Sequence, residues 1–394
     1  MAPSLLNAVI TSAVRTPVGS FRGALAKLSA PTLGAHAVKA AISRSGIEPA
    51  QVEEIYMGNV LQANLGQAPA TQVALKAGCS PTTAATTINK VCASGMKAVM
   101  LAAQNVQTGM SSIMVAGGME SMSNAPYYAP RGAEYGHQKL EDSIIKDGLW
   151  DVYDQVHMGS CAERTAEKFG ISRQAQDDHA ITSYQRAQAA WDRGVFAEEI
   201  VSVPVPPKRS NVAPIMVERD EEFTRIKFDK VPLLRPVFKK ENGTVTAANA
   251  STLNDGASAV VVMAEDKAQA LGAKPLARIV SYADAATHPY EFTIAPSLAV
   301  PIALKRAGLA LSDISLFEFN EAFSVVARVN EQLLGLDPAK CNIAGGAVAL
   351  GHPIGSSGCR ILVTLTHLLK PGQFGCASVC NGGGGASAII IQRL

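Results

Sequence analysis

Two stretches of this 394-residue chain follow the same pattern, and that internal duplication constrains the fold more than any other feature. In the first, residues 86–91 are rich in β-formers, residues 93–107 carry apolar side chains at helical spacing, and residues 112–116 form a short apolar run ending at Gly117-Gly118. A strand, a sharp turn, a helix and a second strand make one βαβ unit. This stretch therefore predicts layered α/β structure.

The second stretch lies in the last quarter of the chain. Residues 341–347 lead into a glycine-rich turn, followed by a predicted helix over residues 359–370 and a predicted strand over residues 375–380. Duplicated halves explain the correspondence, and chance similarity between generic βαβ units is the alternative. Each stretch places a reactive residue and a Ser-Gly pair before its helix: Cys92 with Ser94-Gly95, and His352 with Ser357-Gly358.

The segment between the halves departs from this rhythm. It contains Pro126 and Pro130, a polar predicted helix around residues 173–193, and a charge-dense part whose mixed signs are typical of a solvated surface. The predicted domains are an N-terminal half (residues 1–120 and 248–272), an inserted loop domain (residues 121–247) and a C-terminal half (residues 273–394).

Composition narrows the class of protein. Hydrophobic residues make up 47% of the chain and charged residues only 17%, below the typical value of about 25%, which argues against disorder. The 35 Lys and Arg residues nearly balance the 33 Asp and Glu residues. The chain therefore lacks the excess positive charge of a protein that binds nucleic acid mainly by neutralising its phosphates. The apolar runs fall short of the roughly 18 residues of a membrane span, so no membrane partner is expected.

Cys92 is the first candidate catalytic residue. It lies in Asn89-Lys-Val-Cys-Ala-Ser-Gly, at the junction of a predicted strand and helix. A helix N-terminus presents free N–H groups and lowers a thiol pKa from about 8.5 to roughly 3.5–7.5, which favours a nucleophilic thiolate. A small buried residue at a crowded turn is the alternative.

His352 and Cys380 lie in glycine-rich turns. His352 stands between Gly351 and Pro353, where an imidazole is a candidate base near neutral pH. Cys380 precedes Asn381-Gly-Gly-Gly-Gly, where absent side chains let a ligand approach the backbone N–H groups and form an oxyanion site. The glycine run lacks the surroundings of an NAD or ATP loop, and the cysteines lack metal-ligand spacing.

Asn320 follows a predicted strand over residues 315–319 and precedes a helical run. A capping role is plausible in itself, and its neighbour Glu321 could complete a polar network. Neither residue alone identifies a site.

Together, four motifs resemble those of the thiolase family, in its biosynthetic acetoacetyl-CoA branch. The resemblance runs from Arg15-Thr-Pro to the C-terminus. It implies the thiolase fold, with two similar αβαβα halves in five layers, an inserted loop domain and tetrameric assembly. The motifs are Asn89-Lys-Val-Cys-Ala-Ser-Gly, Asn320-Glu-Ala-Phe, Gly346-Ala-Val-Ala-Leu-Gly-His-Pro-Ile-Gly and Cys380-Asn-Gly-Gly-Gly-Gly.

The resemblance implies a role for each motif residue. Cys92 would be the acylated nucleophile, and His352 the base that activates it. Cys380 would move the α-proton of the substrate. Asn320 would hold a water that, with His352, stabilises the thioester enolate. The backbone N–H groups of Cys92 and Gly382 would form the second oxyanion hole.

The resemblance also implies where substrate binds. Basic residues of the loop domain would lie near the adenine and phosphate end of CoA, Ser251 near its pantetheine, and His157 and Met158 in a pocket for short acyl groups. The implied CoA and substrate residues are Tyr184, Arg225, Ile226, Lys227, Lys230, Ser251, His157, Met158, Ala322, Phe323 and Phe292.

A potassium site is implied in the same way. Tyr184, Ala247, Ala248, Ala250 and Val348 match positions that bind potassium in the potassium-activated members, through a phenol oxygen and backbone carbonyls. Oxygen ligands suit a hard cation. The alternative is that these small residues permit tight packing and that the tyrosine is an ordinary helix residue.

The implied activity is that of an acetyl-CoA C-acetyltransferase, an acyltransferase with acetyl-CoA, acetoacetyl-CoA and CoA as substrates and products and no redox cofactor. A degradative, longer-chain 3-ketoacyl-CoA thiolase is the alternative and differs in pocket size. A ketoacyl synthase would pair its cysteine with two histidines. A non-catalytic paralogue would lose Cys92, His352 or Cys380, and none is lost.

Assembly and location are expectations of the same kind. The family resemblance predicts a homotetramer, a dimer of dimers. The absence of an Arg-rich leader favours the cytoplasm over a mature mitochondrial form. The final Gln392-Arg-Leu is a poor match to a peroxisomal address.

Overall fold

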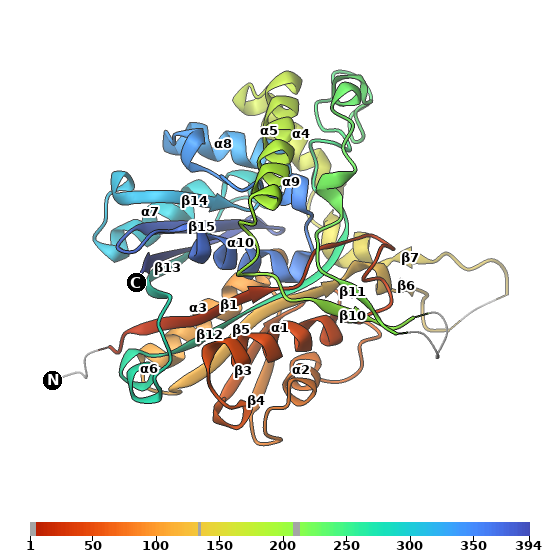
Figure 1. The fold of residues 1–394 in the computed structure, drawn as a ribbon. Helices are drawn as coiled ribbons and strands as arrows, with labels where there is room; N and C mark the ends of the chain where they lie inside the picture. Colours follow the sequence, from red (N-terminus) through yellow and green to blue (C-terminus); the bar gives the residue numbers. More distant parts are fainter. Residues whose placement is uncertain (1–4, 133–134, 208–212) are drawn as a thin grey trace.

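The structure is a computed structural model that describes residues 5–132, 135–207 and 213–394. Residues 1–4 of the predicted N-terminal half, and residues 133–134 and 208–212 of the predicted loop domain, lie outside the described residues. Figure 1 shows the fold. The strands are β1 (Ala8–Arg15), β2 (Gly19–Ser20), β3 (Glu54–Gly58), β4 (Ala84–Ile88), β5 (Ile113–Ser121), β6 (Tyr127–Tyr128), β7 (Glu141–Asp142), β8 (Trp150–Asp151), β9 (Val156–His157), β10 (Val203–Val205), β11 (Ile215–Val217), β12 (Asn254–Ala264), β13 (Ala277–Ala286), β14 (Ile314–Phe319), β15 (Phe374–Asn381) and β16 (Gly385–Arg393). The α-helices are α1 (Ala30–Ser45), α2 (Pro69–Ala77), α3 (Ser94–Gln107), α4 (Met158–Phe169), α5 (Arg173–Asp192), α6 (Glu265–Leu271), α7 (Pro296–Ala307), α8 (Ser324–Leu334), α9 (Ala347–Leu350) and α10 (Ile354–Leu368).

Within the described residues, ten strands form one mixed sheet in the order β14-β15-β16-β13-β1-β12-β5-β3-β4, with β2 paired to β12. β3 runs parallel to β4 and β5, and β14 runs parallel to β15. The two halves meet where β1 pairs with β13, at Val9 with Arg278 and Ile10 with Ala277. The sheet therefore passes from one half of the chain to the other without an open edge between them.

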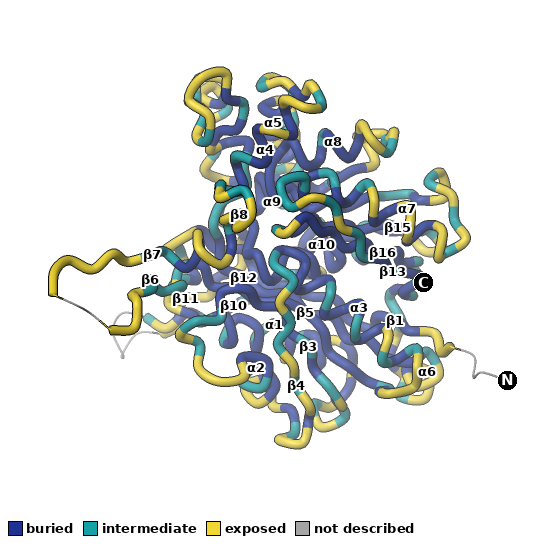
Figure 2. The backbone as a smooth tube through the Cα atoms, turned by 180° about the vertical axis from the view of Figure 1, so that it is seen from behind, coloured by how far each residue is buried: buried dark blue, intermediate teal, exposed yellow. Residues whose placement is uncertain are grey.

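Alternating side chains on the central strands pack against different helix layers. On β12, Val260 and Val262 belong to the core around α3 and α10, whereas Val261 and Met263 belong to the core around α1 and α2. Successive residues of a strand point to opposite faces, so β12 is covered on both sides. Figure 2 shows these strands and helices buried and the exposed segments at the periphery.

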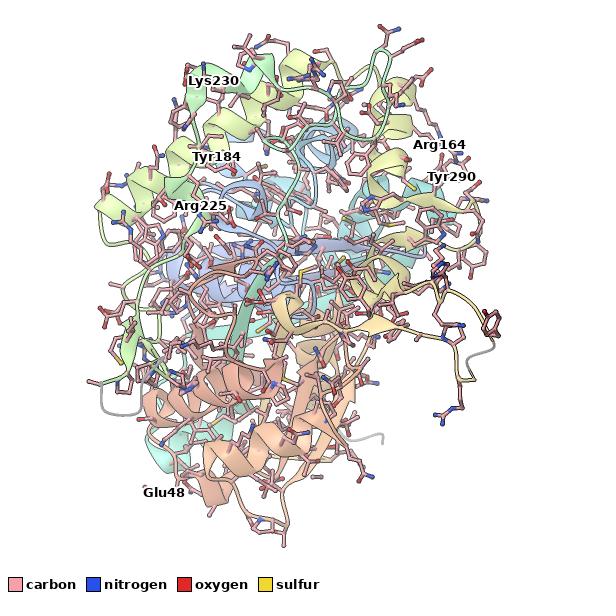
Figure 3. All side chains as sticks on the ribbon, turned by 90° about the vertical axis from the view of Figure 1, so that its right-hand side faces the viewer. Glu48, Arg164, Tyr184, Arg225, Lys230 and Tyr290 are labelled. Carbon is pink, nitrogen blue, oxygen red and sulfur yellow. The ribbon has the colours of Figure 1, made fainter. Side chains whose placement is uncertain are left out.

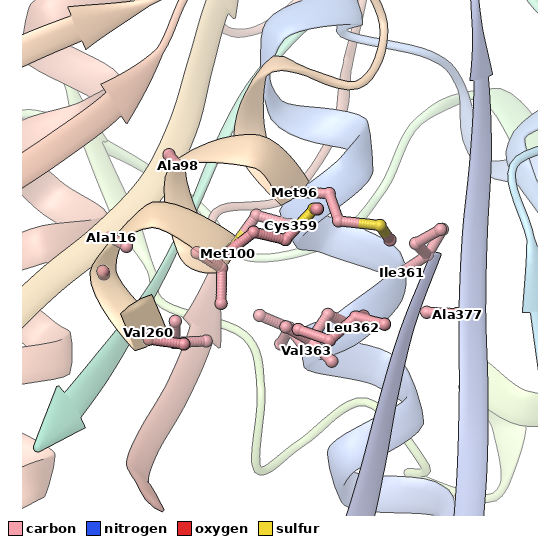
Figure 4. Close-up of a cluster of buried hydrophobic side chains, with 14 of the residues drawn as sticks. Met96, Ala98, Met100, Ala116, Val260, Cys359, Ile361, Leu362, Val363 and Ala377 are labelled. Atoms are coloured by element: carbon pink, nitrogen blue, oxygen red, sulfur yellow. The ribbon is translucent and has the colours of Figure 1, made fainter. Parts of the chain in front are cut away.

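The C-terminal half repeats this arrangement. On β16, Ile389 and Ile391 face the core around α3 and α10, and Ile390 faces the core that includes α7. Figure 4 shows side chains of α3 and α10 meeting in the shared middle layer. The two parts of this one hydrogen-bonded sheet each lie between an outer helix layer and the shared middle layer of α3 and α10, so the order helix, sheet, helix, sheet, helix confirms the predicted five-layered αβαβα fold.

Strand β5 continues through Gly117-Gly118, where the sequence pattern predicted its end. A Cβ at Gly117 would lie 2.0 Å from the carbonyl oxygen of Ser258 in β12, and one at Gly118 would lie 2.1 Å from that of Gly355 in α10. The prediction was wrong because these glycines allow close backbone approach within the sheet and do not mark a turn.

The helix predicted from residue 359 begins earlier, at Ile354, with Pro353 as its N-cap. Ser357-Gly358 therefore lies inside the first turns of α10, and His352 stands directly before the cap. Residues 341–347 form no strand, since Cys341 makes only an isolated bridge with Phe317. The strand that corresponds to the first half is β14, earlier in the chain.

The segment predicted as the loop domain carries α4, α5 and three short two-stranded sheets. Its bounds remain a prediction. A buried ion-pair cluster ties it to β1: the guanidinium of Arg15 bonds Glu199 at 2.5 Å and Asp220 at 2.7 Å. Among the described helices, none combines the length and apolarity needed to cross a membrane.

Candidate active site

Cys92 lies in a tight turn between β4 and α3. The turn begins at Asn89, whose Oδ1 accepts the backbone N–H of Val91 at 3.0 Å, and Ser94 Oγ accepts that of Lys90 at 2.9 Å. Val91 has φ +47°, a backbone conformation that is strained for a β-branched residue. The side-chain bonds from both ends of the turn hold this strained conformation and fix the position of Cys92.

The Cys92 thiol is buried, and its electrostatics differ from the sequence prediction. Burial raises its pKa to about 12, while the backbone N–H of Gly382 and that of Cys92 itself oppose the rise. The expected lowering of the pKa at a helix N-terminus was wrong because desolvation of the charged form outweighs these N–H groups. Cys92 therefore rests as a neutral thiol, with the Gly382 N–H near enough to favour its charged form.

Cys380 lies near the end of β15 and is fully buried. Burial raises its pKa, and the nearby Cys92 raises it further. The two thiols predicted as nucleophile and α-proton carrier thus lie in one site, with Gly382 two residues beyond the second. The catalytic roles of the two thiols remain a prediction.

The His352 imidazole is held at three points. Its backbone N–H donates to Asn254 Oδ1 at 2.8 Å, its Nδ1 lies 2.6 Å from Ser357 Oγ, and its Nε2 lies 3.4 Å from Asn320 Nδ2. Ser357 Oγ donates its own proton to the carbonyl of Pro353 at 3.0 Å, so it accepts from Nδ1–H. Nδ1 therefore carries the ring proton, and the unprotonated Nε2 accepts the long, 3.4 Å contact from Asn320 Nδ2.

Burial lowers the pKa of His352 to about 3, with a smaller contribution from the cationic Arg360. The imidazole is therefore neutral at physiological pH, which is the protonation state that a general base requires.

Asn320 follows β14, and its backbone N–H donates to the carbonyl of Ser378 in β15 at 3.0 Å. It does not cap a helix, because α8 begins at Ser324 with Phe323 as N-cap. The buried Asn320 Oδ1 has no partner within the described residues. A buried amide oxygen without a partner is an acceptor suited to a bound water.

Close contact between α3 and α10 brings the two reactive turns together. A Cβ at Gly95 would lie 2.9 Å from the carbonyl oxygen of Gly355 and 3.0 Å from the backbone nitrogen of Cys359, and one at Gly358 would lie 2.8 Å from that of Met96. Any larger residue would separate the helices. The Ser-Gly pairs noted in the sequence therefore lie where the first turns of α3 and α10 touch, shortly after Cys92 and His352 in the chain.

Most residues predicted to line the acyl pocket lie close together. His157 caps α4, with Nδ1 accepting the N–H of Gly159 at 3.0 Å, and stacks on Phe238 at a ring separation of 4.7 Å. The Met158 sulfur lies 3.7 Å from an ideal Cβ at Gly382. One apolar cluster contains these predicted residues together with Cys380: Met158, Phe292, Ala322 and Phe323.

The basic residues predicted to bind CoA lie on one short segment, residues 225–230. The side chains of Arg225, Lys227 and Lys230 are exposed, and Ile226 packs against the core that contains Tyr184. Figure 3 shows Lys230, Tyr184 and Arg225 along one side of the molecule, away from Arg164 and Tyr290. Ser251 is half-buried, and both its N–H and its hydroxyl donate to the carbonyl of Ala322.

The predicted potassium ligands lie around α5. Tyr184 and Val348 share one buried core, and Asn249, within the run 247–250, donates to Asp177 of α5 at 2.8 Å. Burial raises the pKa of Tyr184, and the nearby carboxylates of Glu222 and Glu321 raise it further. In the part of the chain described, no group of three or more His, Cys, Asp or Glu side chains could hold a metal ion.

Glu321 does complete a polar network, as its position beside Asn320 suggested. The buried carboxylate accepts from His179 Nε2 at 3.0 Å, Ser183 Oγ at 2.8 Å, Asn342 Nδ2 at 2.8 Å and Val348 N at 3.2 Å. These partners lower its pKa to about 2 although burial acts in the opposite direction. The network connects the end of β14 to α5 and to the helix preceding His352.

Comparison with known proteins identifies the family. Models of the N-terminal and C-terminal domains of thiolase match residues 8–266 and 273–393. The chain belongs to the thiolase family. This thiolase is 57% identical over 393 residues to "Acetyl-CoA acetyltransferase, mitochondrial" of Mus musculus, covering 100% of this chain and 92% of that protein. It is 58% identical over 392 residues to "Acetyl-CoA acetyltransferase A, mitochondrial" of Xenopus laevis, covering 99% and 93%.

Two solved structures support the same fold and family. The Acat5 thiolase of Ascaris suum in complex with coenzyme A superposes with a TM-score of 0.94 at 47% identity, covering 98% of this chain and 100% of that one. The acetyl-CoA acetyltransferase of Bacillus anthracis superposes with a TM-score of 0.95 at 38% identity, covering 99% and 100%. The predicted fold and family of this thiolase are confirmed.

Several residues of the site were missed from sequence. Ser357 was noted from sequence only as part of a Ser-Gly pair, and its place in the first turns of α10, five residues after His352, was the signal that could have revealed its contact. Asn254 and Phe238 come from distant segments, and nothing local to them indicates their contacts with His352 and His157. Lys90 was quoted within the Cys92 motif but given no role.

Proposed function

We propose that this thiolase is an acetyl-CoA C-acetyltransferase: it joins two acetyl-CoA molecules into acetoacetyl-CoA and CoA, and catalyses the reverse thiolysis, through an acyl-Cys92 intermediate. The observation that carries the proposal is the meeting of two buried thiols, Cys92 and Cys380, beside the Gly382 N–H. The full-length identity to proteins named acetyl-CoA acetyltransferase supports the short-chain branch over a longer-chain degradative thiolase.

The first half-reaction transfers the acetyl group. The Cys92 proton passes to His352 Nε2 as the sulfur attacks the acetyl-CoA carbonyl, and the N–H groups of Cys92 and Gly382 stabilise the developing oxyanion. Burial disfavours either charge alone, but thiolate and imidazolium form together and stabilise each other. The carbon–sulfur bond to CoA then breaks, and Cys380 gives its proton to the leaving CoA thiolate.

The second half-reaction forms the carbon–carbon bond. The Cys380 thiolate removes an α-proton from a second acetyl-CoA, and the enolate oxygen receives hydrogen bonds from a water held by Asn320 and from His352. The carbanion attacks the acetyl carbonyl on Cys92. Cys92 leaves as a thiolate and regains its proton from His352, so the enzyme returns to its starting state.

A direct test is to map the acetyl group. Brief incubation with acetyl-CoA, acid quench and peptide mass analysis should place it on Cys92, and Cys92→Ala should remain unmodified. Cys380→Ser should still be acetylated yet lose deuterium exchange into a non-cleavable acetyl-CoA analogue. An acetyl group on Cys380, or wild-type exchange in Cys380→Ser, would contradict the assigned roles.

Chain-length specificity separates the two branches of the family. Met158, Phe292 and Phe323 pack in the apolar cluster that contains Cys380, and His157 stacks on Phe238 beside it. We expect these large side chains to limit the length of the acyl group. Thiolysis rates with C4, C6 and C8 3-ketoacyl-CoA should fall steeply with length. Equal rates for C4 and C8 would favour the degradative alternative.

CoA binding follows from the exposed basic segment. Arg225, Lys227 and Lys230 would attract the anionic adenine nucleotide end, and Ser251, beside Ala322, would lie along the pantetheine. Ala322 and Phe323 would line the path to the thiols.

Potassium would be held by the Tyr184 phenol and the carbonyls of Ala247, Ala248, Ala250 and Val348. The donor chemistry fits: all ligands are oxygens, and the carboxylates near Tyr184 make the potential negative. When bound, the ion would supply positive charge that braces the CoA pocket. Rates in potassium, sodium and Tris chloride at matched ionic strength should be highest in potassium, and equal rates would remove the ion from the proposal.

Assembly and location complete the proposal. A homotetramer is expected, and sedimentation at micromolar concentration tests it. The names of the relatives favour mitochondria over the cytoplasm expected from the N-terminus. Fractionation of the source cells, followed by immunoblotting, tests the location.

A further inference from the structure

Lys90, two residues before Cys92, reaches across to the C-terminal half. Its ammonium lies 2.9 Å from Asp284 Oδ1 and 2.9 Å from Ser387 Oγ, and 3.3 Å from both Asn381 Oδ1 and the carbonyl of Ala386. These partners come from β13, β15 and β16. One side chain of the nucleophile turn thus contacts three strands of the other half.

Asn381 makes this contact relevant to catalysis. It stands between Cys380 and Gly382, and its Nδ2 donates to the carbonyl of Gly382 at 2.8 Å. Gly382 also lies against the nucleophile turn, because an ideal Cβ there would lie 3.6 Å from Val91 Cγ1, and its N–H opposes the rise in the pKa of the Cys92 thiol. Lys90 and Gly382 are therefore joined twice, once through Asn381 and once through the Cys92 turn, in a closed ring of contacts.

The carboxylate of Asp284, which pairs with Lys90, is held in its ionised form. Asp284 also accepts from Lys97 Nζ at 2.7 Å and from Ser387 Oγ at 2.6 Å. These donors lower the Asp284 pKa to about 2, so the carboxylate stays ionised near neutral pH. Side-chain exposures of 24% for Lys90 and 34% for Asp284 leave the pair partly shielded from water.

Lys97 provides a matched control. It lies on α3, one turn beyond Cys92, and pairs with the same Asp284 at a similar exposure of 28%. Within the described residues its ammonium makes no hydrogen bond to Asn381 or Ser387. Loss of Lys97 therefore removes one charge from Asp284 but leaves the connection between the two turns in place.

We propose that Lys90 is a positioning residue for acyl transfer, which holds the Gly382 N–H against the Cys92 sulfur by bridging the nucleophile turn to Asn381. The inference rests on the proposed function, because the aligned donor serves the acetyl-Cys92 oxyanion. A misplacement of about 1 Å can cost roughly 100-fold in rate, and removal of one oxyanion donor about 100- to 1,000-fold.

The test is single-turnover acetylation of Cys92 by acetyl-CoA, followed by intact mass, in Lys90→Met, Lys90→Arg and Lys97→Met. We expect acetylation about 10- to 100-fold slower in Lys90→Met, with KM for acetyl-CoA within about twofold because the CoA segment is untouched. Lys90→Arg should recover most of the rate, and Lys97→Met should stay within about threefold of wild type.

The outcomes are distinguishable. A Lys90→Met rate within threefold of wild type would overturn the inference, as would equal slowing in Lys97→Met, which would show a general charge effect. A wild-type enzyme not acetylated on Cys92 would overturn the proposed function and this inference with it. If Lys90→Met does not fold, as judged by its thermal midpoint, Lys90→Gln gives the same comparison with a polar side chain.

Discussion

Replacing Ser357 with alanine should slow acetylation of Cys92 without changing substrate binding. The Ser357 hydroxyl accepts from His352 Nδ1–H at 2.6 Å and donates to the carbonyl of Pro353, so it fixes the tautomer whose Nε2 is free to take a proton. Ser357 is fully buried, and water cannot take the place of its hydroxyl without displacing neighbours. The variant therefore acts on the base alone.

The size of the effect follows from the lost hydrogen bond. A buried N–H left without an acceptor costs about 1–3 kcal/mol. The ring can avoid this cost by moving its proton to Nε2, but that tautomer cannot accept the proton of Cys92. At about 1.4 kcal/mol per factor of ten, acetylation should be roughly 5- to 150-fold slower.

Quench-flow acetylation with acetyl-CoA, read by intact mass, measures the rate directly. The control is Ser356→Ala, one residue away: Ser356 is equally buried but bonds Ser258 Oγ at 2.9 Å and does not contact His352. Ser356→Ala should acetylate near the wild-type rate, and KM should be unchanged in both. A wild-type rate in Ser357→Ala, or equal loss in both variants, would refute the tautomer argument.

Three further predictions concern stability. The Glu321 pKa is lowered from 4.5 to about 2, so its carboxylate stabilises the fold by about 3 kcal/mol above the unfolded pKa. This stability is lost as pH falls from about 4.5 towards 2. In urea unfolding across that range, the free energy of unfolding of Glu321→Gln should therefore fall less steeply with decreasing pH than that of the wild type. Arg15→Met leaves the buried Glu199 and Asp220 unpaired, and should lower the free energy of unfolding by about 3–5 kcal/mol in guanidinium titrations, whereas a loss below 1 kcal/mol would contradict the ion-pair argument. Gly95→Ala should lower it by about 1–3 kcal/mol through overpacking against α10, measured by thermal unfolding, and unchanged stability and activity would show that the helices can separate freely.

The sequence alone located several elements and named the candidate reactive residues. Helix α3 and strands β14 and β15 lie within one residue of their predicted bounds. Periodicity, helix-ending glycines and motif spacing are local properties, so they can be read along the chain. The same local signals place Cys92 and Cys380 at the ends of elements, where the structure has them.

Local signals failed where a glycine had two possible uses. Gly117-Gly118 resembled the end of a strand, yet these residues lie within β5 because β12 and α10 pass too close for a side chain. The N-terminal turns of α10 were missed for the same reason, since Gly355 and Gly358 resemble a loop until the contact with α3 is seen. Whether a glycine ends an element or allows close packing within it depends on a neighbour that is distant in sequence.

The tertiary structure decided the electrostatics of the site and the partners of each reactive group. The position of Cys92 at a helix N-terminus predicted a lowered pKa, but burial by both halves raises it, because desolvation depends on everything that surrounds the sulfur. Likewise Ser357, Asn254 and Lys90 gain their roles only when β12, β15 and the two central helices are packed together. The sequence determined which groups can react, and the packing of distant segments determined their charge and orientation, since both are set by contacts that local sequence does not encode.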